Sequence, residues 1–168
     1  AMIECLGTLG VRIQRTKNEL EISGPIDLSD KTVSINTRMS GASTRILIGL
    51  AALRKGLTRI DGHESLRKRT NEPLLKTLEQ MGCIVKREGV GLPVEISGPV
   101  MSPELEIAGN ISSQYVTALL LISPFLNQEE SVAIKIKGDL VSKPYIDITV
   151  NEMRKRGLRV TWNGSRDL

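Results

Sequence analysis

The fold is decided by the stretch Gly109-Asn110-Ile111-Ser112-Ser113-Gln114-Tyr115, which continues directly into Val116-Thr117-Ala118-Leu119-Leu120-Leu121-Ile122. A Gly-Asn turn precedes two hydroxyls and an amide, and the run that follows is apolar on every side, which predicts a buried helix. Backbone N–H groups in the first turn of a helix lack an intrahelical partner, so this end attracts an anion such as phosphate. The simpler alternative is that the serines only cap their own helix.

A repeated pattern extends outward from this stretch. Three passages of the sequence resemble one another, and the pattern of each predicts a helix that ends at a glycine and is followed at once by a strand. The glycines are Gly10, Gly82 and Gly157, separated by 72 and 75 residues, and such a period indicates a repeated supersecondary unit. The sequence therefore predicts an α/β fold of repeated β-α-β-α-β-β units around buried parallel helices.

We divide the chain into residues 1–24, the end of a first unit; 25–98, a complete second unit; and 99–168, a third unit without its last strand. The second unit should contain strand Thr32–Asn36, buried helix Gly41–Ala52, strand Thr58–Asp61, helix Glu72–Met81 and a hairpin of Cys83–Arg87 with Pro93–Gly98. The third should contain strand Glu104–Ala108, a helix from Ser112, strand Ser131–Lys137, a helix from Pro144 to Arg156 and strand Leu158–Trp162. A similar hairpin, Val11–Arg15 with Glu19–Gly24, is expected in the first unit. We expect a single incomplete domain cut from a longer protein.

The composition favours small anionic ligands. The 168 residues carry 23 basic and 19 acidic side chains, a net charge of +4, but only four aromatic residues on which nucleic-acid bases could stack. One histidine gives little support for a histidine metal site or a Ser-His-Asp triad. Cys5 and Cys83 are expected to be buried free thiols of a cytoplasmic protein, since no signal peptide or membrane span is evident.

Four segments share one design, in which a small or hydroxyl residue and basic neighbours stand at the start of a helix. They are Ser40–Arg45, Arg67–Asn71, Asn110–Gln114 and Ser142–Tyr145. If the units pack about a common axis, these helix starts face the same end of the domain and form an anion site. No carboxylate pair or metal cluster accompanies them, so the expected site binds substrates without an obvious general base.

The segments Gly109–Gln114 and Ile136–Thr149 closely resemble the 5-enolpyruvylshikimate-3-phosphate (EPSP) synthase family, and the resemblance covers essentially the whole chain. It implies a 3-phosphoshikimate 1-carboxyvinyltransferase of the shikimate pathway. This enzyme moves the enolpyruvyl group of phosphoenolpyruvate to the 5-hydroxyl of shikimate 3-phosphate and releases phosphate, with no metal or organic cofactor. It also implies a fold of two domains, each of three β-α-β-α-β-β units whose buried helices point to the cleft between the domains.

Carried over by motif, the resemblance implies two sets of substrate-binding residues. The set for shikimate 3-phosphate is Ser112, Ser113, Gln114, Ser142 and Tyr145, with the serine hydroxyls on the phosphate and Tyr145 against or near the ring. The set for phosphoenolpyruvate is Gly41, Arg45, Arg69 and Gln114. The forked guanidinium of arginine suits both carboxylate and phosphate.

This chain departs from the family pattern at two places near the expected phosphoenolpyruvate end. Met39-Ser40-Gly41-Ala42 replaces Asn-(Ala/Ser)-Gly-Thr, and Arg69-Thr70 replaces Arg-Pro. The N-terminal Lys-Ser segment of the family and its second domain, with the acidic base and the lysine acid, have no counterpart in the sequence. We therefore expect no catalytic residue in this chain, and we expect it to be inactive without the missing domain, which is its anticipated protein partner.

Two alternatives remain at this level. UDP-N-acetylglucosamine enolpyruvyl transferase shares the expected fold, but its nucleotide-sugar substrate would not require both serine motifs. A nucleic-acid-binding module of small β-α-β-α-β-β units would suit the basic charge, but few aromatics and buried first helices argue against it. We expect neither a nucleic-acid partner nor a membrane partner.

Overall fold

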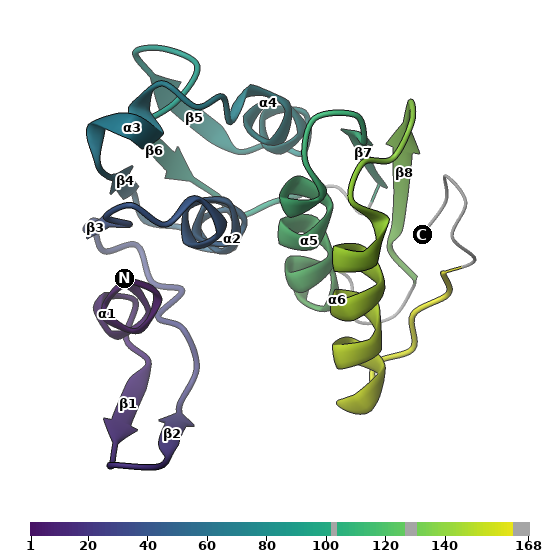
Figure 1. Cartoon of the computed structure of the whole chain (residues 1–168). Coiled ribbons are helices and arrows are strands. Elements are labelled where there is room, and N and C mark those ends of the chain that lie inside the picture. The colour runs from purple at the N-terminus through teal and green to yellow at the C-terminus, as the bar shows by residue number, and fades with distance from the viewer. Residues whose placement is uncertain (102–103, 127–130, 163–168) are drawn as a thin grey trace.

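The computed structural model describes residues 1–101, 104–126 and 131–162, and its middle part is a complete β-α-β-α-β-β unit (Figure 1). The elements in order are β3 (Val33–Asn36), α2 (Gly41–Ala51), β4 (Thr58–Asp61), α3 (Glu64–Arg67), α4 (Glu72–Gln80), β5 (Ile84–Arg87) and β6 (Val94–Ser97). They form a four-stranded sheet of order β3-β4-β6-β5, in which β3 and β4 are parallel and the other pairs antiparallel. The predicted order of this unit is confirmed, apart from the one-turn helix α3, which the sequence analysis did not anticipate.

The elements on either side repeat parts of this order. Before it come α1 (Met2–Thr8) and an antiparallel hairpin of β1 (Arg12–Arg15) and β2 (Leu20–Ser23). After it come β7 (Glu104–Ala108), α5 (Ser113–Ile122), the short 3-10 helix η1 (Ser123–Phe125), β8 (Ala133–Lys137) and α6 (Lys143–Lys155). Strands β7 and β8 are parallel, as β3 and β4 are, so the crossover helices α2 and α5 are equivalent.

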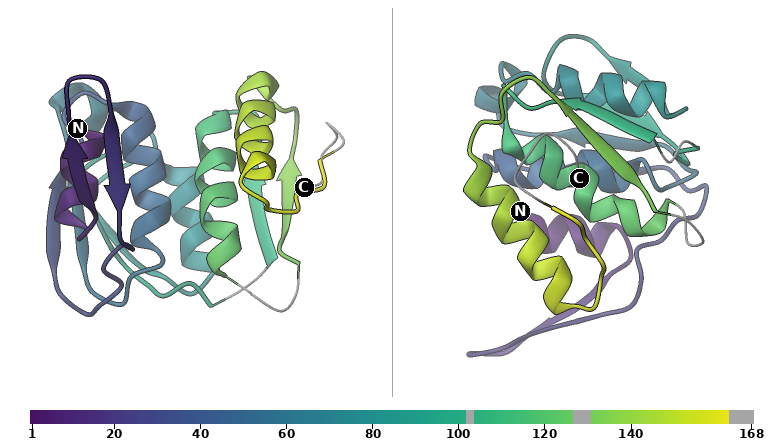
Figure 2. Two further views of the ribbon diagram at one scale, coloured as in Figure 1. Left: turned by 90° about the horizontal axis from the view of Figure 1, so that it is seen from below. Right: turned by 90° about the vertical axis from the view of Figure 1, so that its right-hand side faces the viewer.

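Helices α2 and α5 form the centre of the core, as the apolar composition predicts. They run side by side through the middle of the molecule (Figure 2). Contact is close at Gly49, where a Cβ atom would lie 3.3 Å from Cβ of Ala118 and 3.1 Å from its carbonyl oxygen. Leu119 and Leu120 are buried and Leu121 is half-buried. The helices start at the same end of the molecule, because Ala42 of α2 and Ser113 of α5 line one cleft.

The second helix of each unit covers the first strand of the next. Helix α1 packs on β3, where Sγ of Cys5 donates to the Asn36 carbonyl at 3.4 Å. Helix α4 packs on β7 in the same way, and Oγ1 of Thr77 donates to the Glu106 carbonyl at 2.7 Å. The three predicted glycines follow α1, α4 and α6 with left-handed φ angles, +91° at Gly10, +94° at Gly82 and +85° at Gly157. The sequence repeat therefore corresponds to two repeated structural features, a helix that ends at a left-handed glycine and the packing of that helix on the first strand of the next unit.

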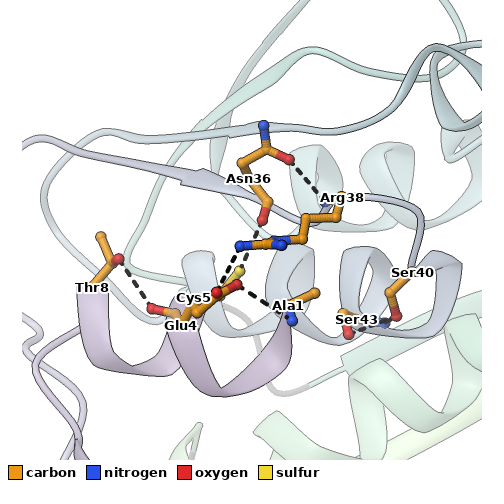
Figure 3. A network of polar contacts seen from close by, with 8 residues as sticks. All are labelled: Ala1, Glu4, Cys5, Thr8, Asn36, Arg38, Ser40 and Ser43. Carbon is orange, nitrogen blue, oxygen red and sulfur yellow. Dashed lines mark hydrogen bonds and ion pairs between the residues drawn. The ribbon is translucent and has the colours of Figure 1, made fainter.

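A polar network fixes the loop that leads into α2 (Figure 3). Arg38 has the left-handed φ of +53°, and its N–H donates to Oδ1 of Asn36 at 2.8 Å. Its guanidinium donates to Oε1 of Glu4 in α1 at 2.7 Å. Two residues on, Oγ of Ser40 accepts from the Ser43 N–H at 3.2 Å and caps α2. The start of α2 is therefore held by its own cap and by a contact with α1.

One predicted element is wrong. Residues 158–162 form no strand, although Leu158–Trp162 was expected to be one. The Val160 carbonyl accepts two bonds from the Arg154 guanidinium, at 3.0 Å from Nε and 2.7 Å from Nη2, instead of a ladder bond. The remainder of the expected third unit, residues 163–168, lies outside the described residues.

Both cysteines are free and buried, as predicted, and burial raises the pKa of the Cys83 thiol to about 11. Over the described residues, none of the helices combines the length and the apolar character needed to cross a bilayer.

Candidate functional site

Three helix starts meet around one cleft of about 450 Å³. Its polar lining comes from the first two turns of α5 and α6 and the N-cap residues before them, and its apolar lining includes Ala42 and Ile46 from the first turns of α2. We call it the serine cleft, lined by Ala42, Ile46, Ile111, Ser112, Ser113, Gln114, Thr117, Val141, Ser142, Tyr145, Ile148 and Thr149. All five residues expected to bind shikimate 3-phosphate are among these.

At the start of α5, Ser112 is the N-cap residue. Its backbone is extended, with φ −161° and ψ 129°, and its Oγ accepts from the Gln114 N–H at 3.2 Å. The capping role weighed as the simpler alternative is therefore present. Ser113, the first residue of the helix, is buried, while Gln114 is exposed at the rim. Capping and an anion site are compatible here, because a serine oxygen that accepts from the backbone keeps its own hydrogen available to donate to a ligand.

At the start of α6, Ser142 has a different geometry. It adopts the left-handed φ of +57° and ψ of 39°, and its side chain makes no capping bond. A residue with a Cβ rarely adopts this conformation, and such strain is concentrated at functional sites. Tyr145, one turn into the helix, is 66% exposed and presents its ring to the cleft.

Two further residues of the cleft lining, Thr117 and Thr149, were not predicted from the sequence. Thr117 and Thr149 face each other from α5 and α6 with their Oγ1 atoms 3.3 Å apart. Thr117 is four residues after Ser113, and Thr149 is four after Tyr145. The helical period of residues i and i+4 could have found both, because such residues share a face.

The other expected set, for phosphoenolpyruvate, lies mostly outside this lining. Gly41 begins α2, and a Cβ atom there would lie 2.7 Å from Nη1 of Arg45 and 3.1 Å from Nη1 of Arg69. We call Gly41, Arg45, Arg69, Thr70 and Tyr115 the arginine corner. It adjoins the serine cleft through the first turn of α2, where Gly41 precedes Ala42.

Within the arginine corner the two guanidinium groups differ in burial. Arg45 is 6% exposed, and it donates to the Gly41 carbonyl at 3.0 Å and to the Thr70 carbonyl at 3.3 Å. Its Nε is buried without a hydrogen-bond partner among the described residues. Arg69 is exposed. Neither forms an ion pair with any carboxylate in the described part of the chain.

Burial shifts the pKa of both buried side chains of this corner. It lowers the pKa of Arg45, as the neighbouring Arg69 charge also does, and it raises the pKa of the Tyr115 phenol against the opposing effect of Arg45. Arginine stays protonated in proteins, so the corner is positive, and the raised pKa leaves the Tyr115 phenol with a proton to donate. Two guanidinium groups without a carboxylate partner attract an anion.

The fourth helix start, Arg67–Asn71, was expected to line the same cleft, but none of its residues is among the lining residues named above. Arg67 ends α3 and pairs with Asp61 at 2.7 Å, whereas Arg69 and the Thr70 carbonyl lie against the first turns of α2. Thr70, which stands in place of the proline usual in the family, caps the approach to α4 by accepting from the Glu72 N–H at 3.1 Å.

The sequence pattern of the EPSP synthase family (3-phosphoshikimate 1-carboxyvinyltransferase) matches residues 1–167 of this chain. The chain belongs to the EPSP synthase family. A 3-phosphoshikimate 1-carboxyvinyltransferase of Nitrosopumilus maritimus is 35% identical over 160 residues, which are 95% of this chain and 37% of that protein. One of Methanocella arvoryzae is 33% identical over 166 residues, or 97% of this chain and 39% of that protein. The chain thus spans under two fifths of the length of these relatives.

The structural comparison agrees on the fold. An EPSP synthase from Acinetobacter baumannii superposes with a TM-score of 0.72 at 22% identity, covering 98% of this chain and 37% of that one. This similarity confirms the enolpyruvyl transferase fold inferred from the repeat. Neither the family match nor the relatives support the UDP-N-acetylglucosamine enzyme or a nucleic-acid-binding module.

Proposed function

We propose that this chain forms the half-site for shikimate 3-phosphate in a 3-phosphoshikimate 1-carboxyvinyltransferase. The full-length enzyme transfers the enolpyruvyl group of phosphoenolpyruvate to the 5-hydroxyl of shikimate 3-phosphate and releases phosphate. The residues 1–168 supply most of one domain of it, built from the three units described above. The observation that carries this proposal is the meeting of Ser112, Ser113, Gln114, Ser142 and Tyr145 in one cleft.

The serine cleft suits the phosphate and the ring of shikimate 3-phosphate. Hydroxyls of Ser112, Ser113 and Ser142 donate to phosphate oxygens, and the positive ends of α5 and α6 add to the attraction. The strained Ser142 keeps its hydroxyl uncommitted to capping, which leaves it for the ligand. The exposed Tyr145 ring offers a flat apolar surface for the shikimate ring.

The arginine corner suits phosphoenolpyruvate. The exposed Arg69 guanidinium can form paired hydrogen bonds with a carboxylate or a phosphate, and Gly41 allows the ligand to approach the start of α2. Gln114 lies at the rim of the neighbouring cleft and reaches between the two substrates. No cofactor is required for this arrangement of binding groups.

Proton transfer falls to groups elsewhere in the full-length protein. None of the residues named as lining the serine cleft is a carboxylate, a histidine or a lysine. Catalysis needs acid and base groups positioned on both sides of the reacting atoms. We therefore expect residues 1–168 alone to release no phosphate from phosphoenolpyruvate and shikimate 3-phosphate above background.

An NMR titration of the chain with shikimate 3-phosphate tests the proposal. An open cleft screens each charged contact, so we expect a Kd on the order of millimolar, equivalent to about 4 kcal/mol. Shifts should centre on Ser112, Ser113, Gln114, Ser142 and Tyr145. The double variant Ser112→Ala, Ser113→Ala should weaken binding about tenfold or more.

The matched control is Ser123→Ala, at the opposite end of α5, where the hydroxyl donates to the Leu120 carbonyl at 2.9 Å. It should leave the affinity unchanged. If the ligand instead perturbs Arg154–Arg156 and leaves the cleft serines unaffected, those serines are only caps and the proposal is wrong.

A further inference from the structure

Tyr115 links the two parts of the site across 45 residues of sequence. It belongs to the first turn of α5, directly after Ser113 and Gln114, yet its side chain points inward and is 1% exposed. Its hydroxyl donates to the Thr70 carbonyl at 2.8 Å. The helix that presents hydroxyls to the serine cleft therefore also contacts the segment that carries Arg69.

The Thr70 carbonyl receives a second donor from another helix. Nη2 of Arg45 in α2 donates to the same oxygen at 3.3 Å, while its Nη1 donates to the Gly41 carbonyl. One carbonyl has two lone pairs, so both bonds can form together. Helices α2 and α5 thus converge on the peptide group that immediately follows Arg69.

The neighbouring backbone is fixed as well. The Arg69 N–H donates to the Leu66 carbonyl at 3.1 Å, and the Asn71 N–H donates to the Val90 carbonyl at 2.7 Å. Between these two bonds, the Thr70 carbonyl is held by side chains alone. Loss of the phenol hydroxyl would remove the shorter of its two bonds and let this peptide, and Arg69 with it, move.

We infer that Tyr115 is a positioning residue, whose hydroxyl holds the Arg69–Thr70 peptide against α2 and so orients the Arg69 guanidinium for its anion. This inference rests on the proposed function for the identity of the anion, phosphoenolpyruvate. It adds a residue outside both sets of substrate-binding positions. It also gives a reason for a tyrosine here, since an apolar ring of similar size would fill the same core volume without the bond.

The variant Tyr115→Phe tests the inference, because it removes only the hydroxyl. Phosphoenolpyruvate binding, followed at the Arg69 Nε–Hε resonance, should weaken at least fivefold. Shikimate 3-phosphate binding, followed at Ser113 and Ser142, should change less than twofold. In the ligand-free chain the same Arg69 resonance should shift or broaden, which reports positioning without any ligand.

Thr77→Val is the matched control. It removes another hydroxyl bond to a backbone carbonyl, 2.7 Å long and on a side chain that is 4% exposed, but from α4 to β7. It should lower the melting temperature about as much as Tyr115→Phe and leave the Arg69 resonance and both affinities unchanged. Equal effects of the two variants on phosphoenolpyruvate would show general destabilisation and overturn the inference.

The outcomes separate this inference from the proposed function. If wild-type chain binds neither substrate at the named residues, the proposed function fails, and the ligand-free Arg69 resonance still decides whether Tyr115 positions Arg69. If the substrates bind but Tyr115→Phe changes neither that resonance nor phosphoenolpyruvate affinity, Tyr115 is a core residue only.

Discussion

In the serine cleft every polar side chain except Ser113 is at least partly exposed, whereas in the arginine corner Arg45 and Tyr115 are buried. Two tyrosines show the contrast, since Tyr145 is 66% exposed and Tyr115 is 1% exposed. The hydroxyl of Ser142 makes no capping bond, while the guanidinium of Arg45 donates to two backbone carbonyls. The cleft therefore leaves the Ser142 hydroxyl for a ligand, and the corner uses Arg45 and Tyr115 to hold the fold.

Because of this difference, we expect substitutions in the two regions to affect stability and ligand binding to different extents. We expect removal of the exposed Ser142 hydroxyl or Tyr145 ring to cost little unfolding free energy and much affinity. In the corner, Arg45 and Tyr115 should affect both, and only the exposed Arg69 should behave as a cleft residue does. Three further sets of substitutions test the contrast, beginning with the largest effect.

Arg45→Ala should destabilise the chain most, by about 3 kcal/mol in unfolding free energy. It opens a cavity and leaves the Gly41 and Thr70 carbonyls without their charged donor. Arg69→Ala should change stability by less than about 1 kcal/mol, because the side chain is exposed and unpaired within the described residues. Urea unfolding of both variants gives the comparison.

In a binding measurement that is corrected for the folded fraction, Arg69→Ala should have the larger effect of the two variants on phosphoenolpyruvate affinity. Arg69→Ala should abolish measurable phosphoenolpyruvate binding, although it folds normally. A stable Arg45→Ala variant, or an unstable Arg69→Ala variant, would contradict the division of the corner into a buried support and an exposed ligand group.

Gly41→Ala should have an intermediate effect, on binding more than on stability. A Cβ atom would lie 2.7 Å from Nη1 of Arg45 and force that guanidinium to move. The strain costs about 1 kcal/mol, and because Gly41 is the first residue of α2 the helix preference of alanine offsets only part of it, so the unfolding free energy should fall by less than about 1 kcal/mol. Phosphoenolpyruvate affinity should fall about tenfold.

Isothermal titration and urea unfolding measure the two quantities for Gly41→Ala. The control is Gly89→Ala, since a Cβ atom there meets nothing within 4 Å. Unchanged phosphoenolpyruvate affinity in Gly41→Ala would show that the ligand does not approach the start of α2.

Ser142→Gly should have the smallest effect on folding, and a favourable one. Glycine adopts the φ of +57° without strain, so the unfolding free energy should rise by up to about 1 kcal/mol. Shikimate 3-phosphate should nevertheless bind more weakly, because the hydroxyl is lost. Thermal unfolding with an NMR titration checks both signs.

Ser142→Ala separates the two contributions, because it removes the hydroxyl and keeps the Cβ atom. It should weaken shikimate 3-phosphate binding as Ser142→Gly does, without the gain in stability. A loss of stability in Ser142→Gly would mean that the Ser142 side chain supports α6, contrary to the absence of a capping bond.

The sequence alone determined most of the secondary structure, and with the family resemblance it named five of the residues that line the cleft. Apolar runs without a polar stripe identified α2 and α5 as interior helices, and three glycines located the helix ends that require a left-handed φ. Both signals are local, since they depend on periodicity and on backbone sterics within a few residues. The serine motifs at two helix starts were visible for the same reason.

Only the tertiary structure decided how the two sets of site residues are divided. The burial of Arg45, the bond from Tyr115 to Thr70 and the path of residues 158–162 depend on segments that are far apart in sequence. Which donor reaches a given carbonyl is set by the packing of α2 against α5, to which many side chains contribute together. No local pattern in the sequence contains this information, so Gly41, Arg45 and Arg69 could be named from the sequence but not placed, and the role of Tyr115 could not be predicted.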